Sequence, residues 1–121
     1  MKTVLKDNLQ QIQHLLLVED KQGKRTIKLE AITCSIGRDS TNSIVLYDRS
    51  VSRQHAILLR IPIPETATYL FRLIDGNLQG NRSTNGLIVN GQRCFSHDLK
   101  HGDTIVFGDV EARYYVQSVG E

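Results

Sequence analysis

The stretch Leu87-Ile88-Val89-Asn90-Gly91 carries the clearest structural signal in this chain. Its three apolar residues favour a β-strand. Asn-Gly is typical of a two-residue hairpin turn, because both positions of that turn require a positive φ. We therefore expect a strand over residues 87–89 that reverses at residues 90 and 91. This hairpin predicts antiparallel β-structure.

Short β-type segments lie on both sides of this hairpin. Many contain branched or aromatic residues, and several alternate apolar and polar positions, which places one set of side chains on a core face. The segments span residues 15–18, 27–31, 34–36, 44–46, 56–61, 69–74, 104–107 and 112–119. Residues 14–121 contain no stretch with three turns of helical period, so the sequence predicts an all-β sandwich or barrel.

The first thirteen residues follow a different pattern. Val4, Leu5, Leu9 and Ile12 recur at near-helical spacing with polar residues between them. A short amphipathic helix and an irregular N-terminal arm both fit this spacing. Because 121 residues suffice for one core, we expect a single domain over residues 14–121, preceded by an arm or short helix over residues 1–13.

Composition and charge exclude several classes of protein. The chain has fifteen Lys and Arg against thirteen Asp and Glu, a net charge of +2 that does not suit a dedicated nucleic-acid binder. The longest purely apolar run, residues 15–18, is too short for a membrane span or a signal peptide, so we expect a cytoplasmic protein. Cys34 and Cys94 lack metal-type spacing and are expected to be reduced.

The unusual polar residues gather between the expected strands, where binding residues are often placed. They form the segments Gly37-Arg38-Asp39, Ser52-Arg53-Gln54-His55 and Asn81-Arg82-Ser83-Thr84-Asn85-Gly86. The two guanidinium groups at positions 38 and 53 match phosphate geometry, and Ser, Thr and Asn add short-range donors. This set is suited to holding an oxyanion. No carboxylate pair or nucleophile–base set accompanies it, so we expect no enzyme and no cofactor.

Three histidines invite other readings. His55 follows Ser52 by three residues, but without an evident acidic partner we interpret it as a hydrogen-bonded structural residue. His97 and His101 have the spacing of metal ligands on a helix. Residues 100–103 predict a turn instead, and no third ligand is evident, so we expect no metal site.

Four motifs together resemble the forkhead-associated (FHA) domain family in order and spacing. They are Gly37-Arg38, Ser52-Arg53-x-His55, Thr84-Asn85-Gly86 and Leu99-x-x-Gly102-Asp103. The resemblance extends from about Leu15 to Val119. It implies a β-sandwich of about eleven mostly antiparallel strands, so that residues 14–121 form an FHA domain. It also implies a loop face that binds phosphothreonine peptides.

The resemblance assigns roles to five residues as ligands. Arg38 and Ser52 are expected to contact the phosphate directly, and Thr84 to add a side-chain hydrogen bond. Arg53 is expected to help hold the phosphate or the peptide. Asn85 is expected to fix the peptide backbone beside the phosphothreonine.

Three further residues are expected to support this site: Gly37 in a tight turn, His55 as a loop brace and Gly86 at a positive φ. The implied partner is a phosphothreonine-containing protein, a substrate of a Ser/Thr kinase in signalling. We expect no nucleic acid, no membrane and a monomer or weak dimer.

Two alternative functions remain open at the level of the sequence. One is a phospho-independent FHA-like scaffold or oligomerisation module. The other is an enzyme such as a phosphatase or nucleotide hydrolase. The Gly-rich segment over residues 76–80 does not favour this enzyme, because it lacks the Gly-Lys-Ser/Thr ending of a phosphate-binding loop.

Overall fold

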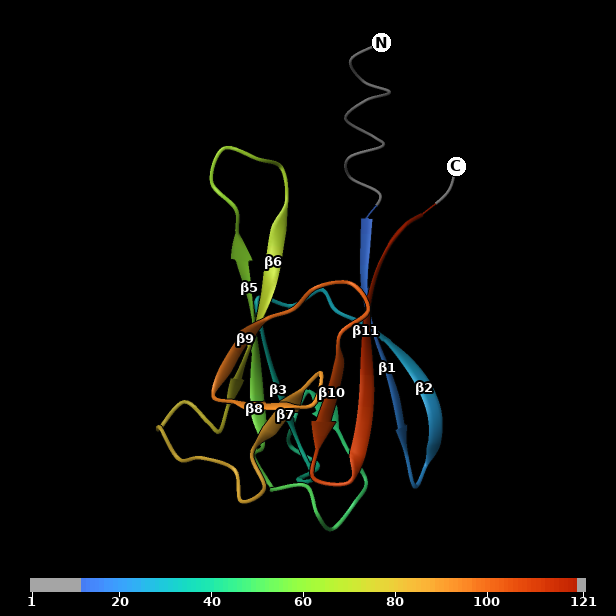
Figure 1. The fold of residues 1–121 in the computed structure, drawn as a ribbon, viewed down its shortest axis with the longest axis vertical. Helices are drawn as coiled ribbons and strands as arrows, with labels where there is room; N and C mark the ends of the chain where they lie inside the picture. The colour runs from blue at the N-terminus through green and yellow to red at the C-terminus, as the bar shows by residue number, and fades with distance from the viewer. Residues whose placement is uncertain (1–11, 120–121) are drawn as a thin grey trace.

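A computed structural model describes residues 12–119 as two packed β-sheets (Figure 1). The eleven strands are β1 (Ile12–Asp20), β2 (Gly23–Lys28), β3 (Thr33–Gly37), β4 (Ile44–Val45), β5 (Ala56–Pro62), β6 (Tyr69–Asp75), β7 (Leu87–Val89), β8 (Gln92–Cys94), β9 (Ser96–Asp98), β10 (Thr104–Phe107) and β11 (Val110–Ser118). The predicted all-β sandwich is confirmed. Within residues 12–119 no helix is long and apolar enough to cross a membrane.

The two sheets differ in size. One has six strands in the order β2-β1-β11-β10-β7-β8, and the other has five in the order β4-β3-β5-β6-β9. Among the described residues, β3 and β4 form the one parallel pair, with Ile36 opposite Ile44. This parallel pair brings the end of β3 beside the start of the segment that leads to β5. The segment therefore begins next to Gly37.

The hairpin predicted from Leu87–Gly91 is present. Leu87 pairs with Cys94 and Val89 with Gln92. Between the two strands Asn90 has φ 51° and Gly91 has φ 83°, as the Asn-Gly turn requires. The side chain of Asn90 also donates to Asp103 over 2.8 Å and accepts from the Thr104 N–H over 2.9 Å, which fastens the turn to the start of β10.

The core lies between the sheets and follows the period of two. In β1 the buried positions are 14, 16 and 18, in β6 they are 71, 73 and 75, and in β11 they are 110, 112 and 114. Tyr114, Phe71, Phe107 and Leu16 are among the largest fully buried side chains. Burial of each such side chain contributes about 1.5–3 kcal/mol, so these inward rows hold the sandwich together.

The N-terminal boundary differs from the expectation. β1 begins at Ile12, two residues before His14, and Ile12 pairs with Ser118 of β11. Ile12 and Gln13 are thus strand residues because β11 extends far enough to pair with them. The rest of the predicted arm or helix, residues 1–11, lies outside the described residues.

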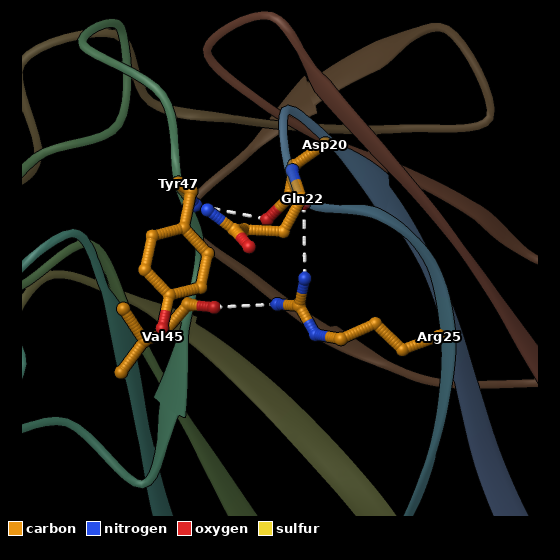
Figure 2. A network of polar contacts seen from close by, with 5 residues as sticks. All are labelled: Asp20, Gln22, Arg25, Val45 and Tyr47. Atoms are coloured by element: carbon orange, nitrogen blue, oxygen red, sulfur yellow. Dashed lines mark hydrogen bonds and ion pairs between the residues drawn. The ribbon is translucent and has the colours of Figure 1, made fainter.

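A buried carboxylate joins the two sheets at one edge. Asp20 accepts hydrogen bonds from Arg25 Nη1 at 2.9 Å and from the Tyr47 N–H at 2.8 Å, and Arg25 Nη2 donates to the Val45 carbonyl at 2.6 Å (Figure 2). Arg25 and Asp20 belong to the β1–β2 hairpin, whereas residues 45 and 47 lie at the end of β4. We call these contacts the Asp20 clasp. It anchors the start of the segment between β4 and β5.

Candidate functional site

Three loops converge at one end of the sandwich. They span residues 38–43 after β3, 46–55 between β4 and β5, and 76–86 between β6 and β7. In Figure 1 the green and gold loops at the lower end lie opposite the end from which β1 enters and β11 leaves. Every residue that the sequence predicts for the site lies on these loops or at their junctions with the strands. We call this end the loop face.

Arg38 is tied to the second loop by its backbone and its side chain. The Arg38 N–H donates to the Ser52 carbonyl and its Nε donates to the Val51 carbonyl, both over 2.9 Å. Within residues 12–119 its two terminal guanidinium nitrogens have no hydrogen-bond or ion-pair partner. The exposed Arg38 head is therefore oriented by the protein and still has donors to offer.

Gly37 lets the first two loops approach each other. The residue is buried, and a Cβ placed there would overlap the carbonyl oxygen of Arg53. Asn42 stabilises this contact between the two loops, since its Nδ2 donates to the carbonyls of Arg53 at 2.6 Å and Asp39 at 2.9 Å. The sequence reasoning missed this role of Asn42. A side-chain amide in a short loop is the only signal that could have indicated it.

Ser52 and Thr84 connect the second and third loops. The Thr84 N–H donates to Ser52 Oγ over 2.8 Å. Because this bond uses Ser52 as an acceptor, the Ser52 hydroxyl keeps its own proton available for a ligand. The Thr84 hydroxyl has no hydrogen-bond partner among the described residues, and Thr84 is exposed. Two hydroxyl groups from different loops thus lie at one junction.

Asn85 forms a second bridge between the same loops. Its Nδ2 donates to the Ser50 carbonyl over 2.7 Å, and its Oδ1 has no partner in residues 12–119. Ser50 Oγ donates to Asp48 over 2.6 Å and accepts from the Asp109 N–H over 2.7 Å. This places Asn85 in a chain of bonds that reaches the turn between β10 and β11. The Nδ2 group of Asn85 is therefore used within the fold, whereas its Oδ1 has no protein partner among residues 12–119.

Arg53 contributes mainly through its backbone. Its carbonyl accepts from Asn42 and from the Asp39 N–H, the latter over 3.3 Å. Its own N–H and its exposed guanidinium have no hydrogen-bond or ion-pair partner within residues 12–119. Arg38 and Arg53 therefore leave the loop face with positive charge that no carboxylate among the described residues offsets within 4 Å.

His55 lies beneath the loops and is fully buried. The Ser52 N–H donates to its Nδ1 over 3.0 Å, so the proton of the ring is on Nε2, which donates to the Gly86 carbonyl over 2.8 Å. Its edge packs on Phe107, with ring centroids 5.6 Å apart. Burial lowers the pKa of His55, outweighing the opposite effects of the Gly86 bond and of Asp75. The neutral ring braces the second loop against the third.

Asp75 and Ser83 shape the third loop, and the sequence reasoning did not single out either. Ser83 Oγ donates a short hydrogen bond to the buried Asp75 carboxylate and accepts from the Gly86 N–H over 2.9 Å. Gly86 has φ 77°, a value that favours glycine. Together these contacts set the backbone on both sides of Thr84 and Asn85.

The other histidines are used within the fold. His97 Nε2 lies 2.8 Å from an Asp103 oxygen, and His101 Nδ1 accepts from the Val116 N–H over 3.0 Å. Among residues 12–119 no three His, Cys, Asp or Glu side chains are grouped to hold a metal ion. Cys34 and Cys94 are free thiols, and burial raises the pKa of each. The donors without partners on Arg38, Ser52 and Thr84 lie on loops that bond one another at the loop face.

Comparisons with known proteins agree with this geometry. The FHA domain family model matches residues 34–108, more than half of the chain. The uncharacterized protein sll1895 of Synechocystis sp. is 38% identical over 94 residues, which are 78% of this chain and 13% of that protein. The chain therefore spans a small part of the length of this curated relative.

Solved structures share the fold. The Slr1951 protein of Synechocystis sp. has a TM-score of 0.80 and 36% identity over 84% of this chain and 96% of that chain. An FHA domain from a structural and functional analysis of phosphothreonine-dependent FHA interactions has a TM-score of 0.70 and 28% identity, over 88% of this chain and 99% of that chain. Because the family model matches residues 34–108, which include the three loops of the loop face, the chain belongs to the FHA domain family.

Proposed function

We propose that the loop face binds phosphothreonine in an extended segment of a partner protein and releases it on dephosphorylation. The observation that carries this proposal is the Thr84 N–H to Ser52 Oγ hydrogen bond of 2.8 Å. It joins the loops that carry Ser52 and Thr84, while the bond from Arg38 Nε to the Val51 carbonyl holds the Arg38 guanidinium against the residue that precedes Ser52.

The donors suit a phosphate monoester. A phosphorylated side chain carries about −1.5 to −2 charges at neutral pH and has three acceptor oxygens. Arg38 offers two guanidinium nitrogens, and Ser52 and Thr84 offer hydroxyl protons. The free Arg53 N–H and guanidinium add further donors at the rim. A carboxylate has fewer oxygens and less charge, so it would leave part of this set unused.

The remaining free group suits a peptide. Asn85 Oδ1 can accept a backbone N–H from the bound segment, while Asn85 Nδ2 keeps its bond to the Ser50 carbonyl. Asn85 would then fix the register of the peptide beside the phosphothreonine. This arrangement favours a disordered segment of a partner over a free nucleotide or an inorganic ion.

The expected affinity is moderate. Each hydrogen bond to a charged group is worth about 1.5–3 kcal/mol net, so three or four supply about 5–10 kcal/mol. Ordering the peptide costs a similar amount, which contacts to the peptide backbone have to offset. The net binding free energy is then about −5 to −10 kcal/mol, a range that contains the value of about −8 kcal/mol for the micromolar dissociation constant that we expect. Such a module acts as a reversible switch in signalling.

The proposed setting follows from the same chemistry. The partner is a cytoplasmic substrate of a Ser/Thr kinase, and the domain acts as a monomer or weak dimer without enzymatic activity. Preference for phosphothreonine over phosphoserine is what the family resemblance implies. Neither nucleic acid nor membrane is part of the proposal, in line with the nearly balanced charge.

The test is a calorimetric titration with a phosphothreonine peptide library beside its phosphoserine and unphosphorylated counterparts. We expect micromolar binding of some phosphothreonine peptides only. Arg38→Ala and Ser52→Ala should each weaken it at least about tenfold, because each removes a bond to a charged group. Arg113→Ala and Ser118→Ala, exposed positions on β11, are matched controls and should leave affinity unchanged.

Three results would contradict the proposal. The first is no binding by any phosphothreonine peptide up to millimolar concentration. The second is partner binding that survives both dephosphorylation and Arg38→Ala, which would identify a phospho-independent scaffold. The third is release of inorganic phosphate from the peptides, which would identify an enzyme.

A further inference from the structure

Two arginines and an aromatic ring line a hollow beside the loop face. The hollow has a volume of about 450 Å³ and lies between the third loop and strand β8. Its lining residues are Asp75, Arg82, Gly86, Arg93, Cys94 and Phe95. None of the roles described for the phosphate site uses either arginine.

Arg82 lies over the ring of Phe95. Its Cζ lies 4.2 Å from the ring centroid, a cation–π contact, and Phe95 is 49% exposed although it is large and apolar. This contact holds the guanidinium group over the ring. The N–H groups along its edge make no hydrogen bond with any residue in the range 12–119. They stay available for a planar anion, which guanidinium binds through two parallel bonds.

Arg93 points its head toward the same hollow from β8. A Cβ added to Gly86 would lie 2.7 Å from Arg93 Nη2, so this guanidinium rests directly against the glycine of the third loop. Within the described residues Arg93 also forms no hydrogen bond and no ion pair. Two unpaired guanidinium groups therefore share one hollow.

The one carboxylate in the hollow does not offset this charge by direct pairing. Asp75 is buried, and its Oδ1 accepts from Ser83 Oγ. Neither arginine lies within 4 Å of it as an ion pair. The hollow consequently presents a buried, hydrogen-bonded carboxylate at its base and two exposed cations at its rim.

The hollow adjoins the proposed phosphate site through the chain itself. Arg82 stands two residues before Thr84, so their Cα atoms are at most about 7 Å apart. Gly86 borders the hollow and follows Asn85 directly. An extended peptide advances about 3.3 Å per residue, so a residue two to four positions from the phosphothreonine can reach the hollow.

We propose that this hollow binds an anionic side chain, a carboxylate or a second phosphate, of the same partner segment that carries the phosphothreonine. The inference rests on the proposed phosphothreonine site and adds a selectivity to it. The first phosphate sets the affinity, and the Arg82–Arg93 pair selects segments with an acidic residue nearby. The two arginines gain the ionic partner that the described protein does not supply.

The test uses the chain with phosphothreonine peptides in which each position from −4 to +4 carries, in turn, Asn, Asp or phosphoserine. We expect one position at which Asp binds about 3–10-fold more tightly than Asn, and phosphoserine at least as tightly as Asp. Arg82→Gln and Arg93→Gln should each reduce this ratio, and the double variant should bring it to about one. Affinity for the Asn peptide should stay within about twofold.

The ratio of the affinities for the Asp and Asn peptides distinguishes selectivity from loop structure. A purely structural role of Arg82 would weaken the binding of both peptides equally and leave this ratio unchanged. Arg113→Gln, on β11, matches the charge change far from the loop face, and Arg49→Gln matches it on the second loop. Both should retain the ratio. A gain with Asp and phosphoserine identifies a general anion subsite, and a gain with phosphoserine alone identifies a second phosphate as the ligand.

The inference is overturned when no position distinguishes an anionic residue from Asn, or when the gain survives the double variant. Loss of the gain in Arg49→Gln instead would assign it to the second loop and also overturn it. In these cases phosphothreonine binding itself persists, so the proposed function stands. Absence of binding by every phosphothreonine peptide overturns both proposals together.

Discussion

At the scale of single residues, the loop face depends on side chains that would not themselves touch a ligand. His55 is the clearest case, since its two ring nitrogens bond the Ser52 N–H and the Gly86 carbonyl. These are the backbone groups of two different loops. Ser83 has a similar position between Asp75 and the Gly86 N–H. These polar side chains hold together the loops that carry Ser52 and Thr84.

His55→Ala should lower the free energy of unfolding by about 2–4 kcal/mol, because it removes a buried ring and leaves the Ser52 N–H and the Gly86 carbonyl without partners. Urea denaturation at pH 7.5 measures this loss. His101→Ala, at an exposed position, is the matched control and should cost less than about 1 kcal/mol. Equal losses for the two variants would show that His55 is not the brace described above.

At the scale of elements, the Asp20 clasp connects the β1–β2 hairpin to the segment that follows β4 (Figure 2). Although burial alone would raise it, hydrogen bonds from Tyr47 and Arg25 hold the pKa of Asp20 below its usual value. The Asp20 side chain is fully buried, so its charge depends on these partners. The clasp therefore stabilises the start of the second loop at Tyr47, six residues before the arginine at position 53.

Asp20→Asn should reduce the free energy of unfolding by about 1–3 kcal/mol, because a neutral amide cannot accept from all the donors that bond Asp20, namely Arg25, the Tyr47 N–H and the Gln22 N–H. It should also raise amide hydrogen exchange at Tyr47, whose N–H loses its carboxylate acceptor. Denaturation and exchange experiments measure these two effects. Glu19→Gln changes the same charge at the exposed neighbouring residue and should cost less than about 0.5 kcal/mol. A similar loss in both variants would contradict the role of the clasp.

At the scale of the whole molecule, several titrating groups bind protons less readily in the folded chain. Burial lowers the pKa of His14 and of His55. The Arg72 hydrogen bond lowers the pKa of Asp98. Asp103 resembles Asp20: burial would raise its pKa, but bonds from Asn90, the Lys100 N–H and His97 lower it. In all these groups the unfolded chain binds more protons, so stability rises with pH.

The fold should therefore lose stability in two steps as the pH falls. Above about pH 6.5 both histidines are neutral in the folded and the unfolded chain, and they take nothing from the free energy of unfolding. Below that pH the unfolded chain takes up protons first, so the free energy of unfolding declines by at most about 1.4 kcal/mol per pH unit for each histidine. The carboxylate contribution is complete above about pH 4 and declines below it. Urea midpoints at pH 7.5, 5.5, 4 and 3 test this order. His14→Gln should reduce the loss between pH 7.5 and 5.5, and a midpoint that rises as the pH falls would contradict the prediction.

The strands predicted from local pattern either alternate between buried and more exposed side chains, as β6 and β10 do, or begin with a short apolar run, as β5 does. Residues 87–89 and 104–107 form strands at the predicted bounds, and residues 56–61 and 69–74 gain one residue each. β9 (Ser96–Asp98) was not predicted, because its residues have no apolar alternation. It is a strand because it pairs with β6, where Arg72 and Asp98 form an ion pair of 2.6 Å. Pairing of this kind depends on the partner strand.

The sequence alone determined the all-β class, the Asn90-Gly91 turn and a set of loop residues suited to an oxyanion, since alternation, turn chemistry and donor type are local properties. Their roles in ligand binding stay predictions. Only the tertiary structure decided which loops meet, that His55 bonds two of them, and that Arg82 and Arg93 share a hollow across the third loop and β8. These contacts join residues distant in the chain, and their geometry follows from the pairing and packing of the two sheets.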